Sequence, residues 1–400
     1  MFFIICVAIS IAGLAVYFLQ AWAACSLIRK ENRVDESYEP FLPPVSILKP
    51  LRGLDDNLFD NLASFCTLDY PEYELLLALQ DCNDPAYKVA VQIRDKYPDK
   101  NISIVVEHCN AGLNPKINNL IPAYRRSCHP YILISDSNVM VDKNYLKELA
   151  WHTHDPDVGL VSNLIKGVGG RSLGARLENL HLNSFIVGSV SFLDRVLGMP
   201  CVIGKSMFFK KEDLKKIGGL ERFKDILAED FIIGREMKRA GRKVALSSHL
   251  VSNVNEFWTV KRFLNRHTRW GKLRWKIGGW KYASELLANP VFIAAVPNLV
   301  NGPTRAGLSF TAIVALVKVL GDSIIGRTMD SCVEHHTTAA GSPFAYFLAP
   351  VKDLIIGVIW FIPLVSSTVD WRGNRYVIGK DSVLLPLRER SHLTYTAQST

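Results

Sequence analysis

The chain has 400 residues, of which 48% are hydrophobic and 21% are charged. This composition excludes a disordered chain and a fibrous repeat, while the length allows either several domains or one domain with membrane segments. The net charge of +9 requires an anionic partner, either nucleic acid or a membrane surface, and the placement of the apolar residues decides between them.

The N-terminal segment is apolar throughout. Residues 1–28 contain no charged residue, and Arg29, Lys30 and Arg33 follow at once. A helix of this length, at about 1.5 Å per residue, exceeds the roughly 30 Å hydrocarbon core of a bilayer. A cleaved signal peptide is the alternative, but no basic segment precedes the run and the run is too long. We predict a membrane anchor over 1–28, with the residues after it on the cytosolic side.

Residues 40–256 alternate short apolar runs with helical patterns. This alternation predicts an α/β domain with a mostly parallel sheet that is covered by helices on both faces. Ligands of such sheets bind beyond the carboxyl ends of the strands. The predicted strands are 45–48, 73–79, 102–106, 131–135 and 158–162, and the predicted helices are 58–65, 87–96 and 117–126.

Carboxylates follow two of these strands. Asp81 and Asp84 come after 73–79, and Asp136 with Asn138 comes after 131–135. Each alone is equally typical of a turn or a helix cap. Two such strand ends on one sheet edge predict an anionic edge that binds a cation or a ligand rich in hydrogen-bond donors.

A third group of polar residues lies further along the chain. Asp230 precedes a helical run over 231–240, where N-capping is the alternative interpretation. Arg266 and Arg269 are three residues apart and share a helix face, and Trp270 follows them. Two guanidinium groups on one face can bind a diphosphate, although a solvated basic face beside a membrane has the same pattern.

Residues 257–284 interleave aromatic and basic side chains, a pattern that favours the headgroup layer of a membrane. Nucleic-acid binding is disfavoured because this stretch adjoins apolar segments. The region 285–368 contains two predicted spans, 307–325 and 344–365. We predict that 286–300, which two prolines interrupt, does not cross the membrane. The basic tail over 369–400 is then cytosolic.

Four charged residues interrupt the C-terminal apolar region. Lys318 and Asp322 are four residues apart, so they can pair on one helix face. Lys352 and Asp353 are adjacent in the chain, which does not let them share a face so neatly. We predict that they mark a bundle interior near a lipid substrate.

The order of these motifs resembles a known family. Asp84, Asp136, Asp230 and Arg266-x-x-Arg269-Trp270 lie between an anchor and later spans. This is similar to the D, D, D, (Q/R)xxRW pattern of family-2-like, membrane-bound inverting glycosyltransferases. Five strings resemble the ceramide glucosyltransferases of family 21 more narrowly: Ser46–Gly53, Leu68–Pro71, Gln80–Pro85, Asn114–Leu120 and Trp371–Tyr376.

The resemblance implies a GT-A-type, Rossmann-like domain that transfers a hexose, with glucose favoured, from a UDP-sugar to the primary hydroxyl of ceramide. It implies Asp230 as the general base, and Mg²⁺ or Mn²⁺ on Asp136 and Asn138. It also implies a multi-pass membrane protein whose catalytic domain faces the cytosol, in a bacterial inner membrane or in the Golgi or endoplasmic reticulum. The donor-binding residues implied are Asp81, Asp84, Lys116, Asp136, Arg266, Arg269 and Trp270.

Two features depart from that family. Asn138 replaces the second acidic residue of a D-x-D motif, and the segment His181–Leu197 does not look like the acceptor region of the animal enzymes. The alternatives are a hopanoid or other lipid glycosyltransferase that uses UDP-N-acetylglucosamine or another UDP-hexose, a processive polysaccharide synthase, and a non-catalytic membrane scaffold.

Overall fold

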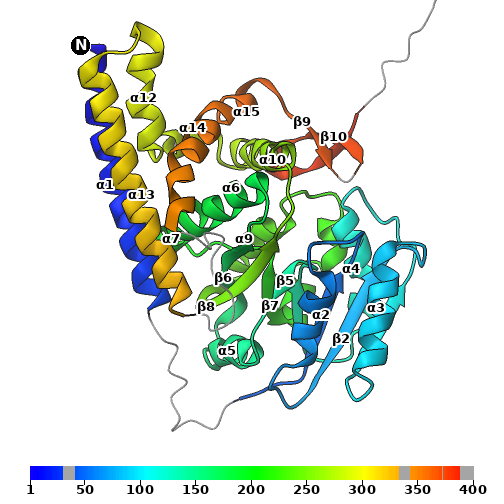
Figure 1. The fold of residues 1–400 in the computed structure, drawn as a ribbon. Coiled ribbons are helices and arrows are strands. Elements are labelled where there is room, and N and C mark those ends of the chain that lie inside the picture. The colour runs from blue at the N-terminus through cyan, green and yellow to red at the C-terminus, as the bar shows by residue number, and fades with distance from the viewer. Residues whose placement is uncertain (30–40, 333–342, 372, 388–400) are drawn as a thin grey trace, which may run out of the picture.

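The computed structural model describes residues 1–29, 41–332, 343–371 and 373–387. Two long apolar helices, α1 (Phe2–Ile28) and α13 (Arg305–Asp330), lie side by side along one edge of an α/β domain (Figure 1). The segment predicted as a membrane anchor is therefore one continuous helix.

The α/β domain is built on an eight-stranded sheet with the order β3-β2-β1-β4-β7-β6-β8-β5. The pairs β1–β2, β2–β3, β1–β4 and β6–β8 are parallel, which confirms the predicted mostly parallel sheet. The strands are β1 (Val45–Pro50), β2 (Tyr73–Leu79), β3 (Ile102–Val106), β4 (Tyr131–Ser135), β5 (Val139–Met140), β6 (Val158–Gly169), β7 (Ser206–Lys210) and β8 (Lys243–Asn255).

Three of these strands were not predicted, and β6 runs seven residues further than expected. Strand β8 carries Ser247, Asn253 and Asn255 at fully buried positions, so it lacks the apolar run that marks a buried strand. Strand β7 pairs antiparallel with both β4 and β6, which interrupts the simple strand–helix alternation.

Helices cover both faces of the sheet. Neighbouring residues of β1 point to opposite faces, with Ile47 in one apolar core and Leu48 in the other. The first core includes α2 (Leu58–Cys66), α3 (Pro85–Lys96) and α5 (Tyr145–Trp151). The second includes α4 (Pro115–Arg126), α8 (Lys211–Lys216) and α9 (Glu229–Arg239).

The strand order reverses at β1, since β2 flanks it on one side and β4 on the other. A crevice forms at such a point beyond the carboxyl ends of the two strands. Leu51 and Arg52 follow β1 there, and Asp136 follows β4.

A long helical segment joins the α/β domain to the apolar helices. It comprises α6 (Leu173–His181), the π-helical turn η2 (Leu182–Ile186) and α7 (Val187–Arg195).

Helix α1, at about 40 Å, is longer than the hydrocarbon core of a bilayer. Its last turn supplies Leu27 and Ile28 to a core with Val187 of α7 and Leu164 of β6, so this end of α1 packs on the α/β domain.

The C-terminal half begins with α10 (Val260–Gly278), η4 (Gly279–Tyr282) and α11 (Ala283–Leu287). The stretch Val260–Leu287 meets α12 (Pro290–Asn301) at a bend of 75°. Among the described residues, three helical stretches are long and apolar enough to cross a membrane, and the bent pair is a fourth if it forms one span. The three are α1, α13 and Ala345–Val365, which contains α14 (Ala349–Ile359) and α15 (Ile362–Val365).

The four charged residues of this region form one buried cluster. Lys318 Nζ lies 2.6 Å from Asp322 Oδ1, as the spacing predicted. Lys352 and Asp353 also pair, at 2.9 Å, although adjacent helical residues were not expected to share a face. Lys318 Nζ lies 3.7 Å from Asp353 Oδ2, so α13 and α14 are joined by charge as well as by packing.

The region predicted as a basic tail begins with a small antiparallel sheet of β9 (Thr368–Trp371), β10 (Asn374–Ile378) and β11 (Leu384–Pro386). It packs on the α/β domain, where the Leu227 amide donates to the Ser382 carbonyl oxygen at 3.0 Å. Residues 368–386 therefore lie on the same side of the apolar helices as the α/β domain. Residues 388–400 of the predicted tail lie outside the described residues.

Candidate active site

A large cleft opens beyond the carboxyl ends of β1 and β4. It encloses about 3250 Å³ of space, including the part open to solvent, and α10 and β9 contribute to its walls. Nine basic and six acidic side chains line it, an excess of three positive charges among the described residues. Such a surface suits an anion like a nucleoside diphosphate. Most of the predicted site residues line it, namely Lys116, Asp136, Asn138, Asp230, Arg266, Arg269 and Trp270.

Three lysines converge on Asp136 at the floor of the cleft. Its carboxylate lies 2.9 Å from Lys116 Nζ and 2.8 Å from Lys205 Nζ. Lys49 Nζ donates to the Asp136 carbonyl oxygen at 2.6 Å. Burial alone would raise the pKa of Asp136, but the two ammonium groups on its carboxylate hold it well below its usual range. Lys116 also pairs with Glu229 at 3.0 Å, so it bridges the ends of β4 and α9.

The oxygens of Asp136 and Asn138 meet at one point. Lys205 Nζ lies 2.7 Å from Asn138 Oδ1 as well as 2.8 Å from Asp136 Oδ2. Carboxylate and amide oxygens are suitable ligands for Mg²⁺ or Mn²⁺, and here both already coordinate one positive charge. The two residues thus fit a divalent cation, which their side-chain oxygens would hold.

Asp230 lies in the first turn of α9, where Ala228 rather than Asp230 is the N-cap residue. Its carboxylate accepts hydrogen bonds from the Gly204 and Phe231 amides, both at 2.8 Å. A Cβ atom at Gly204 would lie 2.7 Å from Asp230 Oδ2, so this approach requires glycine. Burial and, after it, the Glu229 carboxylate raise the pKa of Asp230 to about 6. A carboxylate with this pKa is suited to general base catalysis near neutral pH.

Helix α10 presents the Arg-x-x-Arg-Trp motif to the cleft. The Arg266 guanidinium lies over Trp270 at 4.4 Å and over Trp258 at 5.1 Å. Its Nε atom is 3.3 Å from Glu178 Oε1, on a fully buried side chain of α6. Arg269 also lines the cleft. The aromatic stacking and the buried carboxylate fix the Arg266 guanidinium group in place.

Asp81 and Asp84 are not among the described residues that line this cleft. The Asp84 carboxylate caps α3 by accepting from the Ala86 amide at 2.9 Å, and it accepts from the Gly53 amide at 2.8 Å. Asp81 is exposed and accepts from the Asn83 amide at 2.8 Å. Asp84 therefore holds the loop after β1, whose residues Leu51 and Arg52 do line the cleft.

Several residues of this site escaped sequence reasoning. Lys49 lies within an apolar strand, and Lys205 precedes a strand that was not predicted. Glu229 could have been noticed beside Asp230, and Glu178 gives no local signal on its helix. Trp371 of β9 lines the cleft and belongs to one of the strings that carried the family resemblance.

Comparisons with known proteins agree with this architecture. The profile of glycosyl transferase family 21 matches residues 4–384. Ceramide glucosyltransferase 3 of Caenorhabditis elegans is 30% identical over 367 residues, which cover 90% of this chain and 78% of the relative. Ceramide glucosyltransferase of Gibberella zeae is 23% identical over 464 aligned positions, covering 88% of this chain and 87% of the relative.

Among solved structures, the mannosyltransferase PcManGT from Pyrobaculum calidifontis, in complex with GDP-Man and Mn²⁺, matches with a TM-score of 0.53. The match covers 91% of this chain and 98% of that structure at 16% sequence identity, so it supports the predicted GT-A fold and nothing finer. The family profile spans nearly the whole chain, including most of α1, the residues of the cleft, and β9 and β10. This chain belongs to glycosyltransferase family 21.

Proposed function

We propose that this enzyme transfers a hexose, with glucose favoured, from a UDP-sugar to the primary hydroxyl of ceramide, with inversion at the anomeric carbon. The observation that carries the proposal is the cleft itself. A carboxylate with a raised pKa stands there beside a cluster of cations, next to apolar helices. The relatives named as ceramide glucosyltransferases support the choice of donor and acceptor.

Asp230 takes the proton of the acceptor hydroxyl in this proposal. An unactivated alcohol is a poor nucleophile, so a positioned base must remove its proton as the oxygen attacks the anomeric carbon. The bond from that carbon to the β-phosphate oxygen breaks in the same displacement. One base suffices for inversion because the diphosphate is already a good leaving group.

The cations of the cleft hold the diphosphate and stabilise the charge that develops on it. Lys116 and Lys205 meet at Asp136, and Arg266 and Arg269 approach from α10. Preorganised positive groups act strongly in such a partly buried site. A divalent cation held by Asp136 and Asn138 would supply further positive charge to the same leaving group. The nucleoside contacts predicted for Asp81 and Asp84 stay predictions.

We further propose that the catalytic domain and the small C-terminal sheet face the cytosol. Three apolar helical stretches fit a membrane protein, and α12, with 12 residues, is too short to cross one alone. Crossings by α1, α13 and the α14 region then leave both parts on one side. The basic and aromatic residues of 257–284 would lie in the headgroup layer, where Trp280 is 80% exposed.

The test is product analysis with purified full-length protein in detergent. Ceramide and UDP-glucose should yield β-glucosylceramide, identified by mass spectrometry and by its anomeric configuration. A parallel panel of UDP-hexoses and hopanoid or glycerolipid acceptors distinguishes the alternative lipid glycosyltransferases. The proposal fails if no UDP-hexose yields a product with any ceramide.

A further inference from the structure

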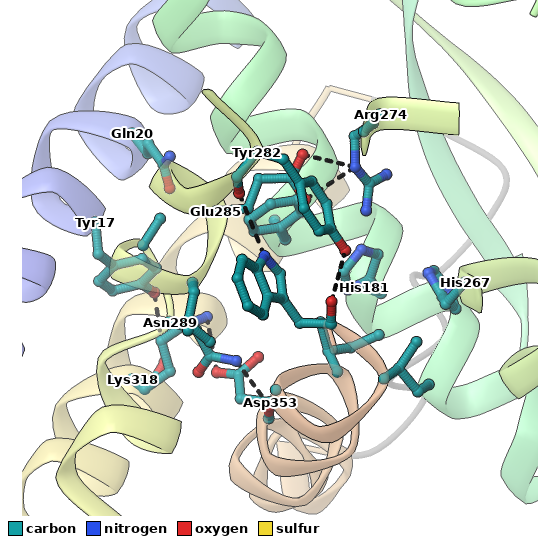
Figure 2. Close-up of a pocket in the computed structure, with 17 residues that line it drawn as sticks. Tyr17, Gln20, His181, His267, Arg274, Tyr282, Glu285, Asn289, Lys318 and Asp353 are labelled. Atoms are coloured by element: carbon teal, nitrogen blue, oxygen red, sulfur yellow. Dashed lines mark hydrogen bonds and ion pairs between the residues drawn. The ribbon is translucent and has the colours of Figure 1, made fainter. Parts of the chain in front are cut away.

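A second space, which we call the interfacial cavity, lies where α6 and α10 meet α1, α13 and α14 (Figure 2). Its volume is about 30 Å³, which leaves room for one small polar group. Arg274, Tyr282 and Glu285 line both this cavity and the active-site cleft. The two spaces therefore adjoin at these three side chains.

His181 is the least satisfied polar side chain of the interfacial cavity. Only 1% of it is exposed, yet neither ring nitrogen has a hydrogen-bond partner within the described parts of the chain. Its ring stacks on Phe185 at 5.0 Å and meets the edge of His267 at 4.3 Å, which holds it in place. The π-helical turn η2 follows it directly, a feature frequent at functional sites.

The ring of His267 adds a second unpartnered nitrogen. Its Nε2 lies 2.8 Å from Glu178 Oε2, so this atom is a donor to the carboxylate, and Nδ1 has no partner among the described residues. Burial lowers the pKa values of both histidines, so both rings are neutral at pH 7. Together they offer one N–H donor and two acceptor nitrogens to a ligand.

The charges that line the interfacial cavity are already paired. Arg274 lies 2.7 Å from Glu285, and Lys318 lies 3.7 Å from Asp353. Figure 2 shows the two histidines with Arg274 on one side of the cavity and Tyr17 with Lys318 on the other. With neutral imidazoles and balanced ion pairs, the cavity suits a polar but uncharged group.

The position of the cavity also suits a lipid. Tyr17 and Gln20 of α1 line it, and the exposed large apolar side chains of that helix end at Trp22. The interfacial cavity thus lies close to the end of the apolar surface. A lipid can place a polar group there while its chains stay in the bilayer.

We propose that the interfacial cavity receives one small polar group of the lipid acceptor, with His181 and His267 hydrogen-bonding to the amide or hydroxyl group beside the reactive primary alcohol. This inference rests on the proposed function and extends it to the recognition of the acceptor. His181 is then a specificity residue, through which the enzyme prefers lipids with an amide over lipids with only ester groups.

The test compares ceramide with diacylglycerol, which has a primary hydroxyl but neither an amide N–H nor a second hydroxyl. Replacing His181→Phe should lower kcat/KM for ceramide roughly tenfold or more, because buried polar groups of the ligand lose their partners. The KM for the UDP-sugar should stay unchanged, and any activity on diacylglycerol should change little. His181→Gln keeps one donor and one acceptor and should retain part of the preference. The matched control is His249→Gln, at a histidine that pairs with Asp142 and lines neither space.

A binding measurement separates this inference from the proposed reaction. A photoreactive ceramide with a methylated primary hydroxyl cannot accept a sugar, but it should crosslink to peptides of α6, α10 or α14, and less so in His181→Phe. Crosslinks found only in other segments would overturn the inference. So would an equal loss of kcat/KM for ceramide and diacylglycerol in His181→Phe, or a raised KM for the UDP-sugar in that variant. If the wild-type protein makes glucosylceramide while His181→Phe and His181→Gln keep its acceptor preference and crosslinking, only this inference fails. If the wild-type protein makes none, the proposed function itself fails.

Discussion

Two charged regions of the molecule differ in their balance of charge. Lys318, Asp322, Lys352 and Asp353 form a neutral cluster between α13 and α14. The active-site cleft instead carries nine basic and six acidic side chains. A balanced cluster satisfies itself and holds helices together, whereas an excess of positive charge requires an anionic ligand. The first region therefore holds helices together, and the second binds the donor.

The largest expected effect comes from the carboxylate of the cleft. Asp230→Asn removes the proposed base but keeps the shape and the acceptor oxygen of the side chain. Turnover should fall by about 10²–10⁴-fold, the usual contribution of general base catalysis. Binding of UDP, measured by calorimetry, should change little because the cations are untouched. Full activity of this variant would show that another group takes the proton.

Substitutions in the neutral cluster should lower the stability of the fold rather than weaken donor binding. Asp322→Asn removes the negative charge that pairs with the buried Lys318 ammonium group. Removing one partner of a buried ion pair lowers the free energy of unfolding by about 3–5 kcal/mol in other proteins. The unfolding temperature in detergent should fall, while the donor KM of the remaining folded enzyme stays unchanged. The double variant Lys318→Met with Asp322→Leu should recover much of the loss. A changed donor KM with unchanged unfolding temperature would contradict a packing role.

An intermediate effect is expected at Lys205, which occupies the point where Asp136 and Asn138 converge. Lys205→Met removes a charge-assisted contact worth about 1.5–3 kcal/mol, so the affinity for UDP in the presence of EDTA should fall roughly tenfold or more. Stimulation of UDP binding by Mn²⁺ should grow in the variant, because the ion no longer competes with the ammonium group. Equal affinities of wild type and variant in EDTA would remove Lys205 from the donor site.

The smallest effect is expected at Asp84. Asp84→Ala loses the cap of α3 and the contact to the Gly53 amide, at a cost of about 1 kcal/mol in stability. Asp84→Asn keeps the capping oxygen and should stay close to wild type in stability and in donor KM. A large rise in donor KM for Asp84→Asn would instead favour the direct nucleoside contact that the family pattern implies.

The sequence was most informative where a pattern is local. Apolar runs predicted β1 to β4, and the position of Asp136 at the end of a strand predicted its place in the cleft. Lys49 and Lys205 were missed because a lysine in or before an apolar strand has no pattern that sets it apart. Strand β8 was missed because buried polar side chains, among them Ser247, Asn253 and Asn255, interrupt its apolar residues. Glu178 and His181 could not be recognised from the sequence, because both contact His267 only when α6 packs against α10.

The most direct test of the account is the pH dependence of kcat/KM for the acceptor. Asp230 must be ionised to accept a proton, and its pKa is raised to about 6 by burial and by Glu229. Activity should therefore rise with pH through about 6 and then level off. The midpoint should move to lower pH in Glu229→Gln, because the like charge is gone. A flat profile between pH 5 and 7, or an unmoved midpoint in this variant, would contradict Asp230 as the base.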